Sequence, residues 1–285
     1  MTNPIDAANG PASDASHDAP FRHLAVSREG PVATVRLNRP EVRNAFHADT
    51  VAELTRVFAS FQDDADLRAV VLGSTGTAFC SGADLNWMRQ TADYSWVDNH
   101  RDASRLANML WTLTRCPVPV IAEVQGDCHG GGVGLVSCCD VVVAAEAARF
   151  CLSEAKLGLI PATISPYVIH AIGERAARRY FVTAEHFSAE RAQVMGLVHE
   201  VVPLDELAKT TRGIVEAILR NGPNAVRECK TLVREIGSRP ITHELRDVTA
   251  RRIADVRASD EGKAGLNAFL TRGTPPWVTA SSEQR

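Results

Sequence analysis

Apolar residues in this chain fall into short runs that predict buried strands. Ala69–Gly73, Val118–Val124 and Asp140–Ala145 are rich in β-branched residues and lack the polar alternation of a half-exposed strand. Two earlier segments, His23–Arg28 and Pro31–Leu37, are separated by a Glu-Gly pair and predict a β-hairpin. The first half of the chain therefore predicts a sheet with a hairpin at one end.

Helical spacing of apolar residues appears between these strands. Asp49–Asp63 predicts an amphipathic helix, and Ala103–Thr114 predicts a second helix that stops before Cys116-Pro117. The intervening Asn86–His100 is polar and rich in Trp and Met, and its pattern assigns no element. A loop of this kind beside a site often shapes specificity.

After Val201-Val202-Pro203 the strand pattern stops. Asp205–Asn221, Pro223–Gly237 and Thr242–Ser259 predict three helices, with Asp205 as an N-cap and Pro223 in a first turn. The expected organisation is a tail at 1–20, a core at 21–203, and a helical region at 204–285 whose wide apolar stripes suit packing on the core or subunit contacts.

A glycine-rich turn separates two of the predicted strands. It runs from Gly126 to Gly134 and leads into an apolar helical turn, Leu135–Cys139. Unpaired backbone N–H groups at such a helix start bind an anion, or an oxygen that becomes anionic during a reaction. A P-loop would need Gly-Lys-Ser/Thr, and a lipase-type oxyanion loop would need a downstream G-x-S-x-G; neither is present. Glycines that only allow close packing remain the alternative.

A second turn has the same plan. The strand Ala69–Gly73 leads into a Gly/Ser/Thr loop, Ser74–Gly82, and then into a predicted helix start with Asp84 in its first turn. Two strand-to-helix turns that aim backbone N–H groups into one cleft are what a two-donor oxyanion hole requires.

Composition limits the other functions. The 285 residues carry 31 basic and 34 acidic side chains, so bulk charge does not favour nucleic acid. Seven cysteines without C-x-x-C and nine histidines without H-E-x-x-H predict reduced thiols and no metal site. The first 20 residues lack the apolar region of a signal peptide, and no segment has the length of a membrane span. We expect a disordered tail and a cytoplasmic protein.

The motifs together resemble the crotonase (enoyl-CoA hydratase/isomerase) superfamily, from Leu37 to Phe269. They are Phe79-Cys80-Ser81-Gly82-Ala83-Asp84-Leu85, the Gly126–Gly132 turn with Cys139-Asp140, and Ser153-Glu154 with Gly158-Leu159-Ile160-Pro161. The sequences of two segments, Ser137–Asp140 and Phe150–Pro166, most resemble those of bacterial methylglutaconyl-CoA and isohexenylglutaconyl-CoA hydratases. The resemblance implies an α/β (α+β) fold, a spiral of β-β-α turns with a C-terminal helical region.

The resemblance also implies the catalytic groups. The backbone N–H groups of Ala83 and Gly131 would bind the thioester oxygen as it becomes an enolate, and Glu154 would be the acid/base. Glu154 follows a mostly apolar stretch, so partial burial should raise its pKa toward a useful value. The alternative is an exposed glutamate that opens a helix.

One position departs from the two-glutamate hydratases. Their second glutamate lies three residues after the oxyanion glycine, where this chain has Gly134. A single glutamate is the arrangement of Δ3,Δ2-enoyl-CoA isomerases, yet the glutaconyl-CoA branch also resembles this chain in having glycine there. We expect Glu154 alone to activate water, with Asp127, His129 or the substrate's own carboxylate helping to position it.

Further residues are expected to bind the substrate. The resemblance places the coenzyme A part of the substrate along Arg43, Ala83, Asp84, Leu85 and Gly131, and places Phe269 and Arg272 near the nucleotide, the last two from a neighbouring subunit. It implies a homotrimer or a dimer of trimers, and no separate cofactor. Packing or surface charge would explain Phe269 and the arginines equally simply.

The interpretation is thus a syn hydratase for a branched enoyl-CoA of the 3-methylglutaconyl type. An enoyl-CoA isomerase is the first alternative. A non-catalytic acyl-CoA-binding or RNA-associated member, or a lyase, thioesterase or dehalogenase on the same scaffold, remains open because fold does not determine reaction.

Overall fold

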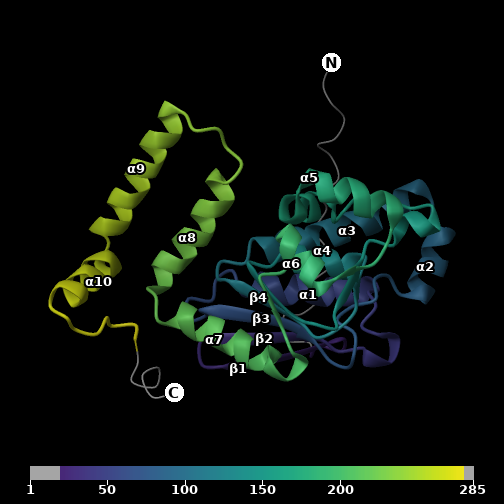
Figure 1. Cartoon of the computed structure of the whole chain (residues 1–285), viewed down its shortest axis with the longest axis horizontal. Coiled ribbons are helices and arrows are strands. Elements are labelled where there is room, and N and C mark those ends of the chain that lie inside the picture. The colour runs from purple at the N-terminus through teal and green to yellow at the C-terminus, as the bar shows by residue number, and fades with distance from the viewer. Residues whose placement is uncertain (1–19, 279–285) are drawn as a thin grey trace.

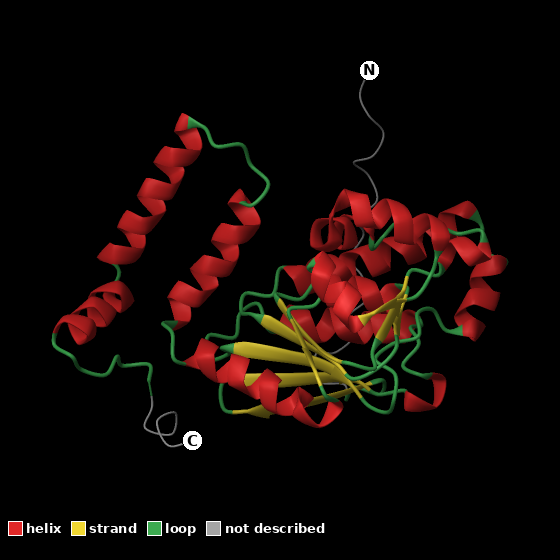
Figure 2. Ribbon diagram, viewed as in Figure 1, coloured by secondary structure: helices red, strands yellow, loops and turns green. Residues whose placement is uncertain are grey.

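The fold centres on a six-stranded mixed sheet, seen in a computed structural model that describes residues 20–278. Its strand order is β1-β2-β3-β4-β6-β9, with β1 antiparallel to β2 and the other neighbours parallel. These strands are β1 (Leu24–Glu29), β2 (Val32–Leu37), β3 (Ala69–Ser74), β4 (Val120–Val124), β6 (Val141–Ala145) and β9 (Glu200–Val202). A separate small sheet, visible in Figure 2, joins β5 (Cys128–His129), β7 (Arg149–Cys151) and β8 (Phe187–Ser188). The mixed α/β class predicted from sequence is confirmed.

Helices cover both faces of the large sheet. One face and its helices form the main core, whose members include Val35 and Leu72 on strands and Leu54 and Leu113 on helices. These helices are α1 (Ala48–Ser60), α2 (Leu85–Ala92), α3 (Trp96–Thr114), α4 (Gly131–Ser137), α5 (Ser165–Thr183) and α6 (Ala189–Met195), with short 3-10 turns at Pro40–Val42 and Glu154–Leu157. Every residue of β3 and β4 is buried, which explains their mostly apolar sequence; the buried Glu123 of β4 pairs with Arg36.

The opposite face of the sheet is covered by α7 (Leu207–Leu219). Leu207 and Val215 pack there against Val71, Ile121 and Val143, and Figure 1 shows α7 lying along the strands. The expected division after residue 203 therefore falls before a helix that belongs to the packed core. The tail expected at 1–20 lies outside the described residues, except for residue 20.

The last three helices form an arm that stands apart from the sheet (Figure 1). They are α8 (Pro223–Ile236), α9 (His243–Ala258) and α10 (Asp260–Leu270). Two cations of α8 hold the arm to the body through main-chain oxygens: Arg227 donates to the Asp64 and Leu67 carbonyls, and Lys230 donates to the Val118 carbonyl. No helix within 20–278 is long and apolar enough to cross a membrane.

Several sequence expectations need correction. The unassigned Asn86–His100 forms α2 and the start of α3, because Asp84 and Ser95 cap these helices through Asn86 N–H and Asp98 N–H. The predicted N-cap Asp205 was wrong: a 3-10 turn, Leu204–Glu206, precedes α7, and its Glu206 N–H donates to the Pro203 carbonyl. Helix α10 was missed, although Ser259 caps it.

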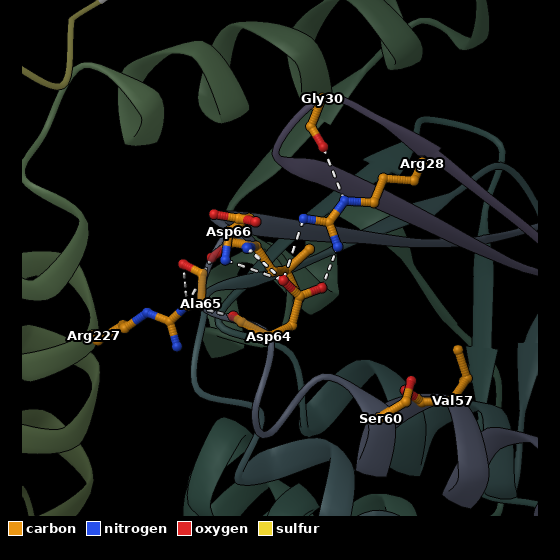
Figure 3. Close-up of polar contacts among 9 residues, drawn as sticks. Arg28, Gly30, Val57, Ser60, Asp64, Ala65, Asp66 and Arg227 are labelled. Atoms are coloured by element: carbon orange, nitrogen blue, oxygen red, sulfur yellow. Dashed lines mark hydrogen bonds and ion pairs between the residues drawn. The ribbon is translucent and has the colours of Figure 1, made fainter. Parts of the chain in front are cut away.

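Asp64 organises the connection between α1, β3 and the arm, as Figure 3 shows. Its carboxylate pairs with Arg28 and accepts the Asp66 and Leu67 N–H groups, while its carbonyl accepts from Arg227. The hydrogen bond and charge of Arg28 lower the pKa of Asp64 despite its partial burial.

We predict that Asp64→Asn lowers the free energy of unfolding by about 1 kcal/mol at pH 7, because a half-exposed ion pair contributes at most about that much. The folded-state pKa is depressed, so this contribution is present above the unfolded pKa of about 4 and is lost as pH falls through the folded value. Urea unfolding at pH 7 and pH 3 measures it. The exposed neighbour Asp63, changed to Asn, is the control; equal losses in both variants would contradict the prediction.

Candidate active site

The two glycine-rich turns lie against each other beyond the ends of β3 and β4. Cys80 pairs with Cys128 as a parallel bridge, and His129 N–H donates to the Cys80 carbonyl at 2.8 Å. The main chains meet at Gly82 and Gly130, because a Cβ on Gly130 would lie 3.6 Å from Gly82 Cα. Both glycines have positive φ, 89° and 51°, which a side chain would strain. The predicted convergence of the two turns is therefore present.

The residues after these glycines carry the two expected oxyanion donors. Gly131 is the first residue of α4, so its N–H has no acceptor within the helix. Among residues 20–278, neither Ala83 N–H nor Gly131 N–H donates a hydrogen bond to another residue. Two free donors on adjoining turns can bind one developing oxyanion.

Glu154 lies beside the same glycines. It begins the 3-10 turn after β7, and the pairing of β7 with β5 brings it there, with Gly130 N–H donating to the Cys151 carbonyl. A Cβ on Gly130 would lie 3.2 Å from Glu154 Oε1, a tight contact that would displace the carboxylate by a few tenths of an ångström. Oε2 is buried and has no hydrogen-bond partner among the described residues. Burial raises the pKa of Glu154, as the sequence predicted.

Close packing explains why position 134 is a glycine. A Cβ at this position would overlap Ile164 Cγ2 and lie 2.8 Å from Ile164 Cβ. Ile164 is 2% exposed and also packs in the main core. An apolar side chain therefore occupies the space that a second carboxylate would need, and sequence alone gave no signal for Ile164.

Asp127 and Arg43 pair with each other at the edge of the site. Arg43 Nη2 donates to Asp127 Oδ2 at 2.7 Å, and both side chains remain partly exposed. Arg43 has a left-handed φ of 54°, and its carbonyl accepts from Ser81 N–H. The structure thus joins a residue expected to bind coenzyme A to one expected to position water.

His129 points toward another histidine. Its ring packs edge-on against His186, with ring centroids 5.1 Å apart. Its Nε2 is buried and has no partner among residues 20–278, and burial lowers the pKa of the imidazole, which is neutral at pH 7. A neutral imidazole can donate to or accept from a bound water.

Asp84 and Leu85 differ in exposure. The Asp84 carboxylate accepts from Asn86 N–H and from Arg39 Nη2 at 2.9 Å; these bonds outweigh burial and lower its pKa. This side chain stabilises the turn that holds Ala83. Leu85 is 69% exposed at the start of α2.

Phe269 and Arg272 lie far from Glu154 in one chain. Phe269 is 81% exposed on α10, and Arg272 follows that helix in a left-handed conformation. Figure 1 places α10 in the arm, apart from α4. The chain alone does not bring these two residues to the site.

One group of side chains has the composition of a metal site. Ligand atoms of His23, His47 and Asp49 lie within 4.8 Å of one another at the start of α1. However, His47 Nδ1 accepts the Thr50 N–H, which places the proton of a neutral ring on Nε2 and makes that atom a poor ligand.

Comparison with known proteins gives the family. The model of the enoyl-CoA hydratase/isomerase family matches residues 27–280. Enoyl-CoA hydratase ACTT6 of Alternaria alternata is 34% identical over 86% of this chain and 80% of its own length. Mevalonyl-coenzyme A hydratase sidH of Aspergillus fumigatus is 32% identical over 86% and 91%. An enoyl-CoA hydratase structure from Shewanella pealeana has a TM-score of 0.88 and 39% identity, over 92% and 98%.

The chain therefore belongs to the crotonase superfamily, in the enoyl-CoA hydratase/isomerase family, and is an enzyme of the enoyl-CoA hydratase class. The family predicted from the sequence motifs is confirmed.

We predict that Gly134→Ala lowers the free energy of unfolding by about 1–3 kcal/mol, because the added methyl overlaps Ile164 in a packed core. Adding Ile164→Ala removes Cγ2, so the double variant should be more stable than the sum of the two single losses. Chemical unfolding of the four proteins measures this coupling. Gly213→Ala is the control, since α7 leaves open space around Gly213; additive losses at 134 and 164 would show that the two residues do not compete for space.

Proposed function

We propose that this protein adds water syn across the 2,3 double bond of a branched enoyl-CoA thioester, of the 3-methylglutaconyl type. The observation that carries the proposal is a single buried carboxylate, Glu154, beside two free backbone donors on adjoining turns. This arrangement supplies one acid/base and one oxyanion site, which are sufficient for water addition to a conjugated thioester.

The proposed reaction adds water to C3 and then a proton to C2. Ala83 and Gly131 N–H groups hold the thioester oxygen. The ionised Glu154 takes a proton from water as the hydroxide oxygen bonds to C3, and the double-bond electrons move to the thioester oxygen as an enolate. Glu154 then returns that proton to C2 and the enolate collapses to the thioester. One carboxylate serves both carbons from one face, so addition is syn.

Water needs a second polar contact because Gly134 provides none. His129 supports this role through its buried, unpartnered Nε2. The distal carboxylate of a glutaconyl substrate is the other source we propose. Asp127 is less available, since Arg43 already binds its carboxylate.

A relative supports the branched substrate. Mevalonyl-coenzyme A hydratase, 32% identical, is named for an acyl group branched at C3. The apolar Ile164, which stands where a second carboxylate would be, also distinguishes this site from that of the two-glutamate hydratases.

The same observation favours one other reaction. A Δ3,Δ2-enoyl-CoA isomerase moves a proton between two carbons and needs one base and an oxyanion site, without water. Glu154 and the two donors would serve it equally. The substrate and the presence of water in the product distinguish the two.

We predict that purified protein rapidly removes the conjugated enoyl thioester absorbance of 3-methylglutaconyl-CoA and acts slowly on crotonyl-CoA. Glu154→Gln should lower kcat by about 10²–10⁴-fold, as removal of an acid/base group does. The acid limb of the wild-type pH profile should lie above the ordinary glutamate pKa, because burial raises it, and activity falls as pH drops through that value.

Other outcomes assign another reaction. Conjugation appearing from a 3-enoyl-CoA, with no loss from either 2-enoyl substrate, would make the enzyme an isomerase. Near wild-type turnover by Glu154→Gln would exclude the proposed acid/base. Acyl-CoA binding that is unchanged in Glu154→Ala, without any turnover, would favour a non-catalytic member.

We also propose a homotrimer, or a dimer of trimers, assembled through the arm. Exposed apolar side chains support this: Leu266, Phe269 and Leu270 on α10 are 51–81% exposed. Such a surface is typical of a subunit contact. In the assembly Phe269 and Arg272 would approach the coenzyme A of a neighbouring subunit.

We predict that Phe269→Asp shifts the molar mass in light-scattering chromatography from that of three or six chains toward one chain. A buried charge at an apolar contact is strongly unfavourable. Val194→Asp, at a position of similar exposure (76%) on α6, is the control and should keep the wild-type mass. A wild-type monomer would contradict the assembly.

A further inference from the structure

Phe46 touches both turns that carry the oxyanion donors. It lies just before α1, is 2% exposed, and belongs to the main core.

The backbone of Phe46 fixes the first donor. Phe46 N–H donates to the Gly82 carbonyl at 2.7 Å, and Asp84 N–H donates to the Phe46 carbonyl at 2.7 Å. Gly82 C=O and Ala83 N–H share one planar trans peptide and point in opposite directions. Holding the carbonyl therefore aims Ala83 N–H away from the Phe46 strand.

The ring of Phe46 packs against the second donor residue. A Cβ on Gly131 would lie 2.9 Å from both Phe46 Cδ2 and Cε2, so the ring edge covers the Gly131 Cα. Gly131 begins α4 and supplies the other free N–H. The ring thus limits how closely the start of α4 approaches the Gly82–Asp84 turn.

Phe46 is itself held firmly. Asn44, 1% exposed and in a left-handed conformation with φ 56°, donates to the Thr75 and Ala78 carbonyls at 2.7 and 2.9 Å. Its Oδ1 accepts from Arg39 N–H. Buried polar bonds of this kind fix the segment that precedes Phe46.

We infer that Phe46 is the positioning residue of the oxyanion hole: its main chain directs Ala83 N–H and its ring sets the position of Gly131 N–H. The inference rests on the proposed role of these two donors. Donors must lie about 2.7–3.1 Å from the developing oxyanion, so a shift of a few tenths of an ångström weakens catalysis more than it weakens binding.

The test is Phe46→Leu in the full-length protein, assayed with the branched enoyl-CoA substrate. Leucine keeps the main-chain bonds and is apolar, but it does not cover Gly131 with a flat ring. We expect kcat to fall about ten-fold, part of the 10²–10³-fold effect of losing a donor, with KM changed less than about two-fold. Phe46→Met, whose longer, unbranched side chain can lie along Gly131, should lose less.

A spectroscopic signature separates positioning from folding. A bound 3-oxoacyl-CoA, acetoacetyl-CoA, forms an enolate when both donors hold its thioester oxygen, and the enolate absorbs at longer wavelength. Phe46→Leu should bind this compound with a smaller enolate absorbance. Phe58→Leu is the matched control, because Phe58 is 0% exposed and packs on Phe61; it should lose stability while kcat and the enolate signal of folded enzyme stay unchanged.

Two results would overturn the inference. One is wild-type kcat with a full enolate signal in Phe46→Leu. The other is an equal fall in kcat and enolate signal in Phe46→Leu and Phe58→Leu after correction for folded fraction. Wild-type protein that neither turns over an enoyl-CoA nor forms the enolate would instead contradict the proposed function, so the two failures are distinguishable.

Discussion

The parallel alignment of two loops beyond the sheet is the constraint on which the site depends. β3 and β4 are parallel neighbours, and the loops that follow them meet again, in a shifted register, at the parallel bridge between Cys80 and Cys128. Since both donors are main-chain N–H groups, their direction is set by this backbone pairing and not by any rotamer. The glycines follow from it, because Gly82 and Gly130 meet main chain to main chain. Buried thiols serve as small packing groups here, and burial raises the pKa of Cys80 to about 12.

One titratable side chain, that of Glu154, is left to carry out the proposed acid/base chemistry. Glu154 lies against Gly130, and one of its oxygens is buried without a hydrogen-bond partner in the part of the chain that the structure describes, a position that disfavours the charged form. Ile164 fills the space beside Gly134, so the side chain at this position is apolar, which favours a low local dielectric. A low dielectric strengthens the interaction of the two donors with a developing enolate. The loss of a second carboxylate is thus compatible with strong electrostatic stabilisation.

The C-terminal arm is held in place by polar contacts, unlike the core. It is attached to the body by Arg227 and Lys230, which bind main-chain oxygens, and by the ion pair of Lys230 with Asp140, and not by a shared apolar core. Glu261 of α10 accepts the Asn224 and Ala225 N–H groups and so caps α8. These polar contacts orient the three helices and leave the apolar residues of α10 facing outward.

The sequence by itself determined the strands of the large sheet, the helices α1, α4, α7, α8 and α9, and the two glycine turns, because apolar periodicity and backbone freedom are local properties. It also gave Glu154 and the missing second carboxylate through the motifs. It missed α2, the beginning of α3 and α10, where polar, exposed helices show little periodicity and only their caps mark them. It also left α5, α6 and the small sheet β5-β7-β8 unassigned. Only the tertiary structure joined Phe46 to Ala83 and Gly131, placed Ile164 over Gly134, and paired Arg43 with Asp127. These contacts link segments 30 or more residues apart, and no local pattern encodes which distant side chain fills a given space.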